Sequence, residues 1–342
     1  MLKIADRTSQ KIRNMGLVCA LCVVVIHSGP MSPDWLVTQI FSDGFTRIAV
    51  PFFFTISGFM LAQHFVDRQW WCVEAKKRIF SLFIPFCIWS AIALALAILP
   101  SVIADYIANR PFGTGMLIFK GSHWMRIFGL DMAAPPLLVP LWYVRCLLMF
   151  VLISPFIAWV VSRLGIFWLL LVFAASLLVY RVPNHSIRFF LDMGFSLSGL
   201  AYFSLGIYLR GKNMDTSRCC AALFALVGIF LLIAKAVLHF CGWRCSVVFG
   251  QLAIPFLLYA SWHFIPVNTF PRWLTDCSFP IFLMHMLFQP YVELAVKRTL
   301  LHDIPFVEPS LKFIFSCVGS IAVASLLRKY WPATSRILFG GR

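Results

Sequence analysis

Ten apolar stretches, most of them about 20 residues long, constrain the fold of this chain more than any other feature. They lie near residues 15–30, 45–65, 79–99, 137–159, 164–180, 189–209, 219–240, 246–263, 273–293 and 310–328. A helix of about 20 apolar residues is long enough to cross a bilayer. In lipid every backbone polar group must be bonded internally, and these continuous runs lack the alternation of barrel strands. The stretches therefore predict an all-α polytopic membrane protein with about ten transmembrane helices.

The composition agrees with this class of protein. Apolar residues make up 61% of the 342 positions and charged residues only 12%, whereas soluble domains are about half apolar and about a quarter charged. One soluble core cannot cover so much apolar surface, but lipid can contact it directly. Because no polar domain or internal repeat interrupts the pattern, we expect residues 1–342 to form one membrane domain. Short cytoplasmic tails are expected near 1–13 and 329–342.

The basic residues predict how the helices are oriented. The net charge is +16, and Lys and Arg are most frequent in segments on the N-terminal side of the membrane when the ten helices alternate. Cytoplasmic segments of membrane proteins carry such an excess. We therefore predict a multi-pass protein of the cell inner (plasma) membrane with both termini in the cytoplasm. Its basic loops would contact anionic lipid head groups, and the sequence predicts no nucleic-acid partner.

Five ionisable side chains interrupt the apolar stretches: His27, Arg47, Arg145, Asp192 and His285. Such groups are costly inside a membrane and commonly mark functional sites. In the alternating topology all five fall in the outer half of the membrane. We therefore predict one polar cavity shared by several helices.

Each of these residues also has a structural interpretation. A single histidine in a helix is commonly a packing residue, and Arg47 could extend to the lipid head groups. Arg145 and Asp192 could simply pair with each other. Ser57, in a Ser-Gly pair, could belong to a close helix contact made by small residues.

Two outer segments add weaker predictions. The longest loop, at about 100–136, mixes Pro, Gly, Trp and charges, and could form a lid or an acceptor-binding element. Cys241 and Cys245 are expected at the external face and could form a disulfide, although their spacing alone is weak support.

Four motifs occur in a defined order along the chain. A first apolar stretch ends in His27 and is followed by the block Val50-Pro51-Phe52-Phe53-Phe54-Thr55-Ile56-Ser57-Gly58-Phe59. A basic run at 76–78 leads into Pro85, and Pro140-Leu141-Trp142-Tyr143 precedes Ser154-Pro155. The last motif is Ser278-Phe279-Pro280-Ile281-Phe282-Leu283-Met284-His285. Together these motifs, over about residues 11–330, resemble the acyltransferase-3 family of integral-membrane O-acyltransferases, which modify surface glycans.

The resemblance implies an acyl-CoA-dependent O-acetyltransferase. Such an enzyme moves an acyl group, commonly acetyl, from cytoplasmic acyl-CoA to a hydroxyl of an extracytoplasmic or lipid-linked glycan. Its partners would be the acyl-CoA co-substrate, the glycan acceptor and membrane lipids, and we expect no bound cofactor and no metal. His27 would act as general base or as a covalent acyl relay, and Arg47 would stabilise the oxyanion. Further candidates for the substrate cavity are His285, Trp142, Arg145, Asp192 and Ser57.

The chain departs from the family pattern at two positions that hold acyl-CoA in that family. Gly16 stands where an arginine is expected eleven residues before His27, and Ser81 stands where a second arginine is expected after Arg78. Four basic residues could supply charge at the cytoplasmic mouth instead: Arg13, Lys76, Lys77 and Arg78.

Two other functions remain open. The missing arginines also suit an acyltransferase relative that binds a ligand without catalysis. A transporter or flippase would likewise have about ten helices and a few buried charges, but it would more typically show internal repeats and paired broken helices.

Overall fold

The computed structural model describes residues 6–29, 34–62, 70–107, 125, 131–210, 212, 217–243, 245–299, 304 and 306–341, and every regular element within them is a helix. Most of the loop predicted at about 100–136, namely residues 108–124 and 126–130, lies outside the described residues.

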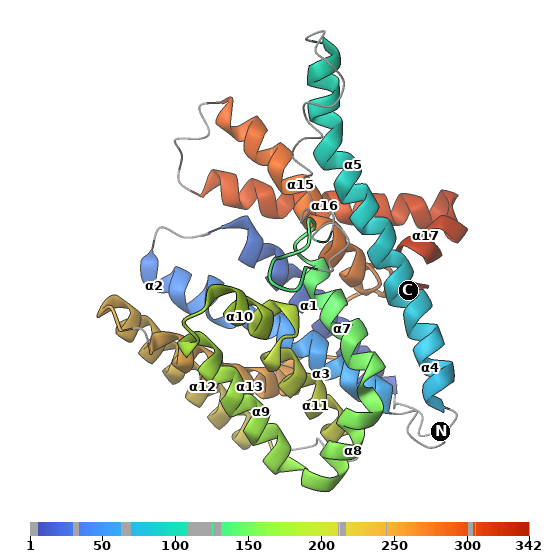
Figure 1. Cartoon of the computed structure of the whole chain (residues 1–342). Helices are drawn as coiled ribbons and strands as arrows, with labels where there is room; N and C mark the ends of the chain where they lie inside the picture. The colour runs from blue at the N-terminus through green and yellow to red at the C-terminus, as the bar shows by residue number, and fades with distance from the viewer. Residues whose placement is uncertain are drawn as a thin grey trace.

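The first half of the bundle is formed by the following helical segments in chain order. They are α1 (Asp6–Ser28), α2 (Trp35–Val37), η1 (Thr38–Ser42), η2 (Phe45–Ile48), α3 (Ala49–Ala62), α4 (Trp70–Arg78), η3 (Ile79–Phe83), α5 (Ile84–Ile107), α7 (Leu141–Leu152) and α8 (Ser154–Leu164). The second half, which Figure 1 colours from green to red, follows. It contains α9 (Ile166–Leu178), η5 (Val179–Arg181), α10 (His185–Phe189), η6 (Phe190–Gly194), α11 (Leu197–Leu209), α12 (Arg218–Phe240), α13 (Ser246–Phe264), α14 (Arg272–Thr275), α15 (Ser278–Lys297), α16 (Val307–Tyr330) and α17 (Pro332–Leu338).

Eight helical segments of the described chain are long and apolar enough to cross a membrane. A ninth span arises if α7 and α8 are counted together, although they are bent by 70° relative to each other. The remaining predicted stretch, 164–180, corresponds to a shorter apolar helix, Ile166–Arg181. The prediction of an all-α polytopic membrane protein is therefore confirmed, while the count of ten spans and the orientation stay predictions.

Several helix boundaries differ from those predicted. Helix α1 begins at Asp6, before the apolar stretch starts, because a helix can continue into water beyond the part that hydropathy marks. The stretch at 137–159 breaks at Ile153, where Pro155 near the start of α8 lacks the N–H that a continuous helix requires. The stretch at 189–209 breaks at Ser196, whose φ is 59° and whose Oγ accepts a bond from the Gly199 N–H.

Helix α1 occupies the centre of the bundle. It packs against α3, α15 and α16 and also touches α13 and α14 (Figure 1). Its buried face is made largely of small side chains, including Gly16, Cys19 and Ala20, which allow neighbouring helices to approach. At the periphery, large apolar side chains such as Phe167, Phe230 and others on α9, α12 and α16 are exposed, as expected for surfaces that contact lipid.

The end of the bundle at which α1 begins collects many cations, and we call it the basic end. Arg7 and Lys11 of α1 lie there beside Arg210, which follows α11. The last described helix, α17, packs against α5 and α16, and Leu338 accepts a 3.0 Å hydrogen bond from the Trp89 indole. We call the other end of α1, which carries His27, the histidine end.

Two glycines bring α3 and α11 into close contact. A Cβ on Gly58 of α3 would collide with the backbone carbonyl of Phe203, and a Cβ on Gly206 of α11 would collide with the carbonyl of Thr55. These two helices therefore pack backbone to backbone, as small residues permit in membrane bundles. The small-residue contact predicted around the Ser57-Gly58 pair is made by Gly58.

We predict that Gly206→Ala destabilises the protein by about 1–3 kcal/mol, because the added methyl group must push apart two backbones that have no flexible side chain between them. The measurement is the thermal unfolding midpoint of the purified protein in detergent. Gly16→Ala is the control, since its Cβ would lie 3.9 Å from the nearest atom, Ser278 Oγ. Equal midpoints for both variants would contradict the close contact.

Candidate functional site

Two of the predicted histidines meet at the histidine end. His27 of α1 and His285 of α15 have ring centroids 5.2 Å apart, with the ring planes inclined by 40°. His285 is completely buried, whereas His27 is partly exposed. The pairing arises because α1 and α15 pack along each other, so residues far apart in the sequence share one site.

The hydrogen bonds of His285 fix the state of its ring. Its Nδ1 lies 3.1 Å from the carbonyl oxygen of Ile281 and 2.9 Å from that of Phe282. Carbonyl oxygens only accept hydrogen bonds, so Nδ1 must carry the proton. In the neutral ring Nε2 is then an acceptor, and this buried atom has no hydrogen-bond partner. The site therefore contains one unused acceptor beside His27.

Polar side chains next to the histidines tie three helices together. The Ser316 hydroxyl of α16 donates a 3.1 Å bond to the backbone carbonyl of His285. The Gln289 amide of α15 donates a 3.4 Å bond to Ser28 Oγ, which itself donates to the Val24 carbonyl. These bonds hold the backbone on both sides of the histidine pair and limit its movement.

A group of charges lies close to His27. Arg47 of η2 forms a 3.2 Å ion pair with Asp43, and 51% of its side chain is exposed. Its charge acts electrostatically on His27 and on Asp192 of η6. Lys235 of α12 donates a 2.8 Å bond to the backbone carbonyl of Asp43. His27 therefore contacts His285 and lies within electrostatic range of Arg47, which also acts on Asp192.

The fifth residue, Arg145, is held differently. Only 6% of it is exposed, and its guanidinium donates to the backbone carbonyls of Asp131 at 2.9 Å and Met193 at 3.2 Å. Arg145 therefore links α7 to the segment before it and to η6. Its environment is that of a structural residue that satisfies main-chain carbonyls.

A cavity of about 240 Å³ lies between the basic end and the histidine pair. Its lining comes from α1, α3, α4, α7 and α15. The residues are Ile12, Phe53, Ile56, Ser57, Met60, Arg78, Tyr143, Ser278, Phe279 and Phe282. We call it the narrow cavity. Phe282 precedes His285 by about one helical turn, so the narrow cavity ends just below the buried histidine.

Three aromatic rings close the narrow cavity on the histidine side. The ring centroids are separated by 6.1 Å for Phe53 and Tyr143, 5.7 Å for Phe53 and Phe282, and 5.4 Å for Tyr143 and Phe282. The Tyr143 hydroxyl donates to the Phe53 carbonyl at 3.1 Å and lies 3.2 Å from Ser57 Oγ. Ser57 therefore lies in the wall of the narrow cavity, and its part in substrate binding stays a prediction.

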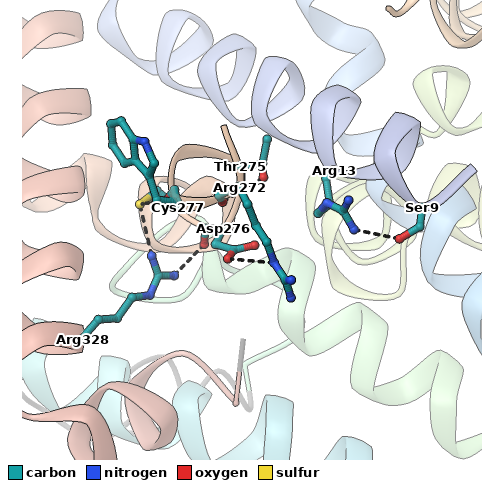
Figure 2. Close-up of polar contacts among 8 residues, drawn as sticks. Ser9, Arg13, Arg272, Thr275, Asp276, Cys277 and Arg328 are labelled. Carbon is teal, nitrogen blue, oxygen red and sulfur yellow. Dashed lines mark hydrogen bonds and ion pairs between the residues drawn. The ribbon is translucent and has the colours of Figure 1, made fainter. Parts of the chain in front are cut away.

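The four basic residues predicted at the cytoplasmic mouth occupy different environments. Arg78 lines the narrow cavity, and its Nε donates a 2.8 Å bond to Glu74. Lys76 and Lys77 are exposed and do not line this cavity. Arg13 donates a 2.8 Å bond to Ser9 of its own helix (Figure 2). One of the four residues is therefore in a position to contact a ligand in the narrow cavity.

Two further arginines lie on and beside the short helix α14, which contacts α1 (Figure 2). Arg328 of α16 donates to the Asp276 carbonyl at 2.7 Å and to Cys277 Sγ at 3.3 Å. Arg272 lies 3.9 Å from the Asp276 carboxylate. These contacts position the start of α15, and with it Ser278 at the mouth of the narrow cavity.

The two positions that lack a family arginine lie close to this mouth. A Cβ on Gly16 would point toward Ser278, one of the lining residues. Ser81 of η3 bonds to the Arg78 carbonyl at 3.4 Å. The space that a long side chain at position 16 would enter is therefore adjacent to the narrow cavity.

Other predicted features are placed outside the site. Trp142 packs in the core beside Phe54, with ring centroids 6.2 Å apart, and does not line the narrow cavity. Cys241 and Cys245 are both free thiols, so the suggested disulfide is absent. Among the described residues no three His, Cys, Asp or Glu side chains are placed to share a metal ion.

Three residues at the site were not selected from the sequence. Tyr143 and Phe282 lie within the quoted motifs, but their apolar rings looked like ordinary core residues. Gln289 follows His285 by about one turn of α15 and bonds to Ser28. The sequence did carry a signal for Gln289: it is a polar side chain one helical turn from His285, within an apolar stretch.

We predict that Arg145→Met lowers the thermal unfolding midpoint clearly, because it removes two guanidinium hydrogen bonds to part-buried main-chain carbonyls, and a hydrogen bond from a charged donor contributes about 1.5–3 kcal/mol. Arg47→Gln should leave the midpoint nearly unchanged, since a half-exposed ion pair contributes about 0–1 kcal/mol. Unfolding followed by tryptophan fluorescence in detergent tests both variants. The reverse ranking would show that Arg145 is not a structural residue.

Comparison with known proteins identifies one similar protein and one matching family. The chain is 26% identical over 254 residues to the succinoglycan biosynthesis protein ExoH of Rhizobium meliloti (strain 1021). The alignment covers 68% of this chain and 63% of that protein. No solved structure matches the chain significantly.

The family comparison covers nearly the whole bundle. The family model described as "Acyltransferase domain" matches residues 14–329, a range that includes His27, all residues that line the narrow cavity except Ile12, and α15 with His285. The chain therefore belongs to the acyltransferase-3 family of membrane proteins.

Proposed function

We propose that this protein is a membrane-embedded O-acyltransferase that moves an acyl group, most simply acetyl, from acyl-CoA to a hydroxyl of a glycan. The observation that supports this most strongly is the His27–His285 pair, in which the buried His285 has an unused acceptor, next to a cavity that leads toward the basic end. Membership of an acyltransferase family supports the same reaction class.

The histidine pair can activate a hydroxyl. Because Nδ1 of His285 is held by two carbonyls, its Nε2 can accept the N–H of His27 after a small rotation of the His27 ring. The other nitrogen of His27 then keeps a lone pair and can take the proton of the acceptor hydroxyl. In this scheme His27 is the catalytic base and His285 is a positioning residue.

The transfer step follows from this arrangement. As His27 takes the proton, the acceptor oxygen attacks the thioester carbonyl and forms a tetrahedral oxyanion. Collapse of this intermediate forms the ester and breaks the C–S bond, and the CoA thiolate takes the proton from His27. In this proposal Arg47, whose charge acts on His27, partly leaves Asp43 and stabilises the oxyanion. A covalent acyl-His27 relay remains the alternative route.

The narrow cavity suits the arm that carries the thioester. Arg78 lies at its mouth, Ser57 and Tyr143 offer hydroxyls along its wall, and its low polarity keeps bulk water from the thioester. We assign the basic end to the cytoplasm, where acyl-CoA is available. The rings of Phe53, Tyr143 and Phe282 must then part before the acyl group reaches His27.

The acceptor is proposed from two observations. The relative named above is a succinoglycan biosynthesis protein, and the charged groups around Arg47 lie at the end of α1 opposite the basic end. We therefore propose a polysaccharide or lipid-linked glycan hydroxyl as acceptor. The protein would act in the plasma membrane, with the sugar arriving on the extracytoplasmic side.

We predict that His27→Ala lowers the rate of acyl transfer by about 10²–10⁴-fold, the usual contribution of a general base. The measurement uses inside-out vesicles, radiolabelled acetyl-CoA and a pool of lipid-linked glycan, with CoA release followed in parallel. His185→Ala, a substitution of an exposed histidine on α10, is the matched control and should keep the wild-type rate.

Other results would point to the competing functions. If the wild type neither binds acetyl-CoA nor releases CoA, the replacement of the two family arginines by Gly16 and Ser81 would favour a relative without catalysis. Flux of a glycan lipid that needs no acyl-CoA would favour a flippase. Full activity in His27→Ala would remove this histidine from the mechanism.

A further inference from the structure

The basic end contains a second and larger cavity, of about 790 Å³, which the proposed reaction does not use. We call it the wide cavity. It lies on the other side of α3 from the narrow cavity, and Ile56 contributes to the walls of both. The wide cavity is bounded by α3 and α11 on one side, by α12 and α13 on the other, and by the start of α1.

The wide cavity results from the way two helix pairs meet. Helix α12 packs along α13, and α11 packs along α3 (Figure 1). The α12–α13 pair is attached mainly at the histidine end, through η1 and η2, while α13 makes only slight contact with α3. Pro255 within α13 lines the cavity and interrupts the regular hydrogen bonding of that helix. The two pairs therefore diverge toward the basic end.

The inner part of the wide cavity is apolar. Its wall is built from six side chains of α3, α11, α12 and α13: Phe52, Leu205, Phe224, Pro255, Phe256 and Leu258. Water is disfavoured next to so much apolar surface because it finds few hydrogen-bond partners there. Inside a membrane, hydrocarbon chains are the material that fills such a space.

The rim of the wide cavity is cationic. Five Lys and Arg side chains line it, and none of the described lining residues is acidic; the five are Arg7, Lys11, Arg210, Lys212 and Arg218. The Arg210 guanidinium lies 4.8 Å from the centre of the Phe59 ring. Lys11 lies 5.6 Å from the centre of the Trp262 ring and donates a 3.3 Å bond to the Trp262 carbonyl. Aromatic rings thus hold cations at the opening.

A cationic rim above an apolar interior is complementary to an anionic amphiphile. Basic pockets between transmembrane helices bind phosphate head groups of anionic lipids. We propose that the wide cavity binds one anionic phospholipid from the leaflet at the basic end. The phosphate contacts Arg210, Lys212 and Arg218, and the first part of the acyl chains lies along Phe224 and Phe256. The bound lipid fills the space behind α3 and supports the helix that also carries the wall of the narrow cavity.

The test is titration of the delipidated full-length protein in detergent with phosphatidylglycerol, followed by native mass spectrometry. The wild type should bind one phosphatidylglycerol at least about 10-fold more tightly than zwitterionic phosphatidylcholine. The double variant Arg210→Gln/Arg218→Gln should lose this preference. Arg272→Gln/Lys329→Gln removes two charges from the same end of the bundle outside the cavity and should bind like the wild type.

A second variant tests the apolar part without changing the charge. Leu205→Trp places a larger side chain in the cavity wall and should weaken phosphatidylglycerol binding about 10-fold while all five cations remain. Equal phosphatidylglycerol binding by the wild type and both cavity variants would overturn the proposal. It would also be overturned if 3′,5′-ADP, the nucleotide end of CoA, displaced the lipid from the wild type, because the cavity would then be a nucleotide site.

Discussion

The contact between α1 and α15 is the interaction on which the site depends. It places two imidazole rings against each other inside a bundle that otherwise buries apolar side chains. Burying such groups without hydrogen bonds is costly, and the structure offsets part of that cost through the two carbonyls that accept from His285 Nδ1. The cost that remains is concentrated at one atom, Nε2 of His285. The unused acceptor lies next to a partly exposed histidine, an arrangement that suits proton transfer.

Helix α3 separates the two cavities, and its position is fixed by backbone contact. Gly58 and Gly206 allow α3 and α11 to approach until only glycine fits between them. The narrow cavity then forms where α3 faces α7 and α15, and the wide cavity forms where it faces α13. A shift of α3 would therefore change both cavities together. Lipid in the wide cavity would add to the contact with α11, because it would support α3 on the side where α13 barely touches it.

Much of the fold could be predicted from the sequence, because hydropathy over about 20 residues reports directly on membrane spans. The breaks were harder to predict. The bend between α7 and α8 was not predicted, although Pro155 is a local signal for it, and nothing local indicated that Ser196 would adopt a positive φ. The hydrophilic start of α1 was missed for a related reason, since hydropathy marks where lipid begins and does not mark where a helix begins.

The site was predicted only in part. The cost of ionisable groups in lipid identified His27 and His285, whose rings meet, and Arg47, whose charge acts on His27 and Asp192. The same criterion also identified Arg145, which bonds to main-chain carbonyls. Side-chain type cannot distinguish a guanidinium that faces a ligand from one that satisfies two distant carbonyls. Tyr143 and Phe282 could not be separated from core aromatics, because their role depends on the cavity that they close.

The central claim is that the narrow cavity leads acyl-CoA to His27. The most direct measurement is a cryo-EM structure of the full-length protein with a non-hydrolysable thioether analogue of acetyl-CoA. We predict that the analogue enters beside Arg78, displaces the rings of Phe53, Tyr143 and Phe282, and places its acyl end against His27. An analogue bound in the wide cavity, or with its acyl end away from both histidines, would show that acyl-CoA takes another path.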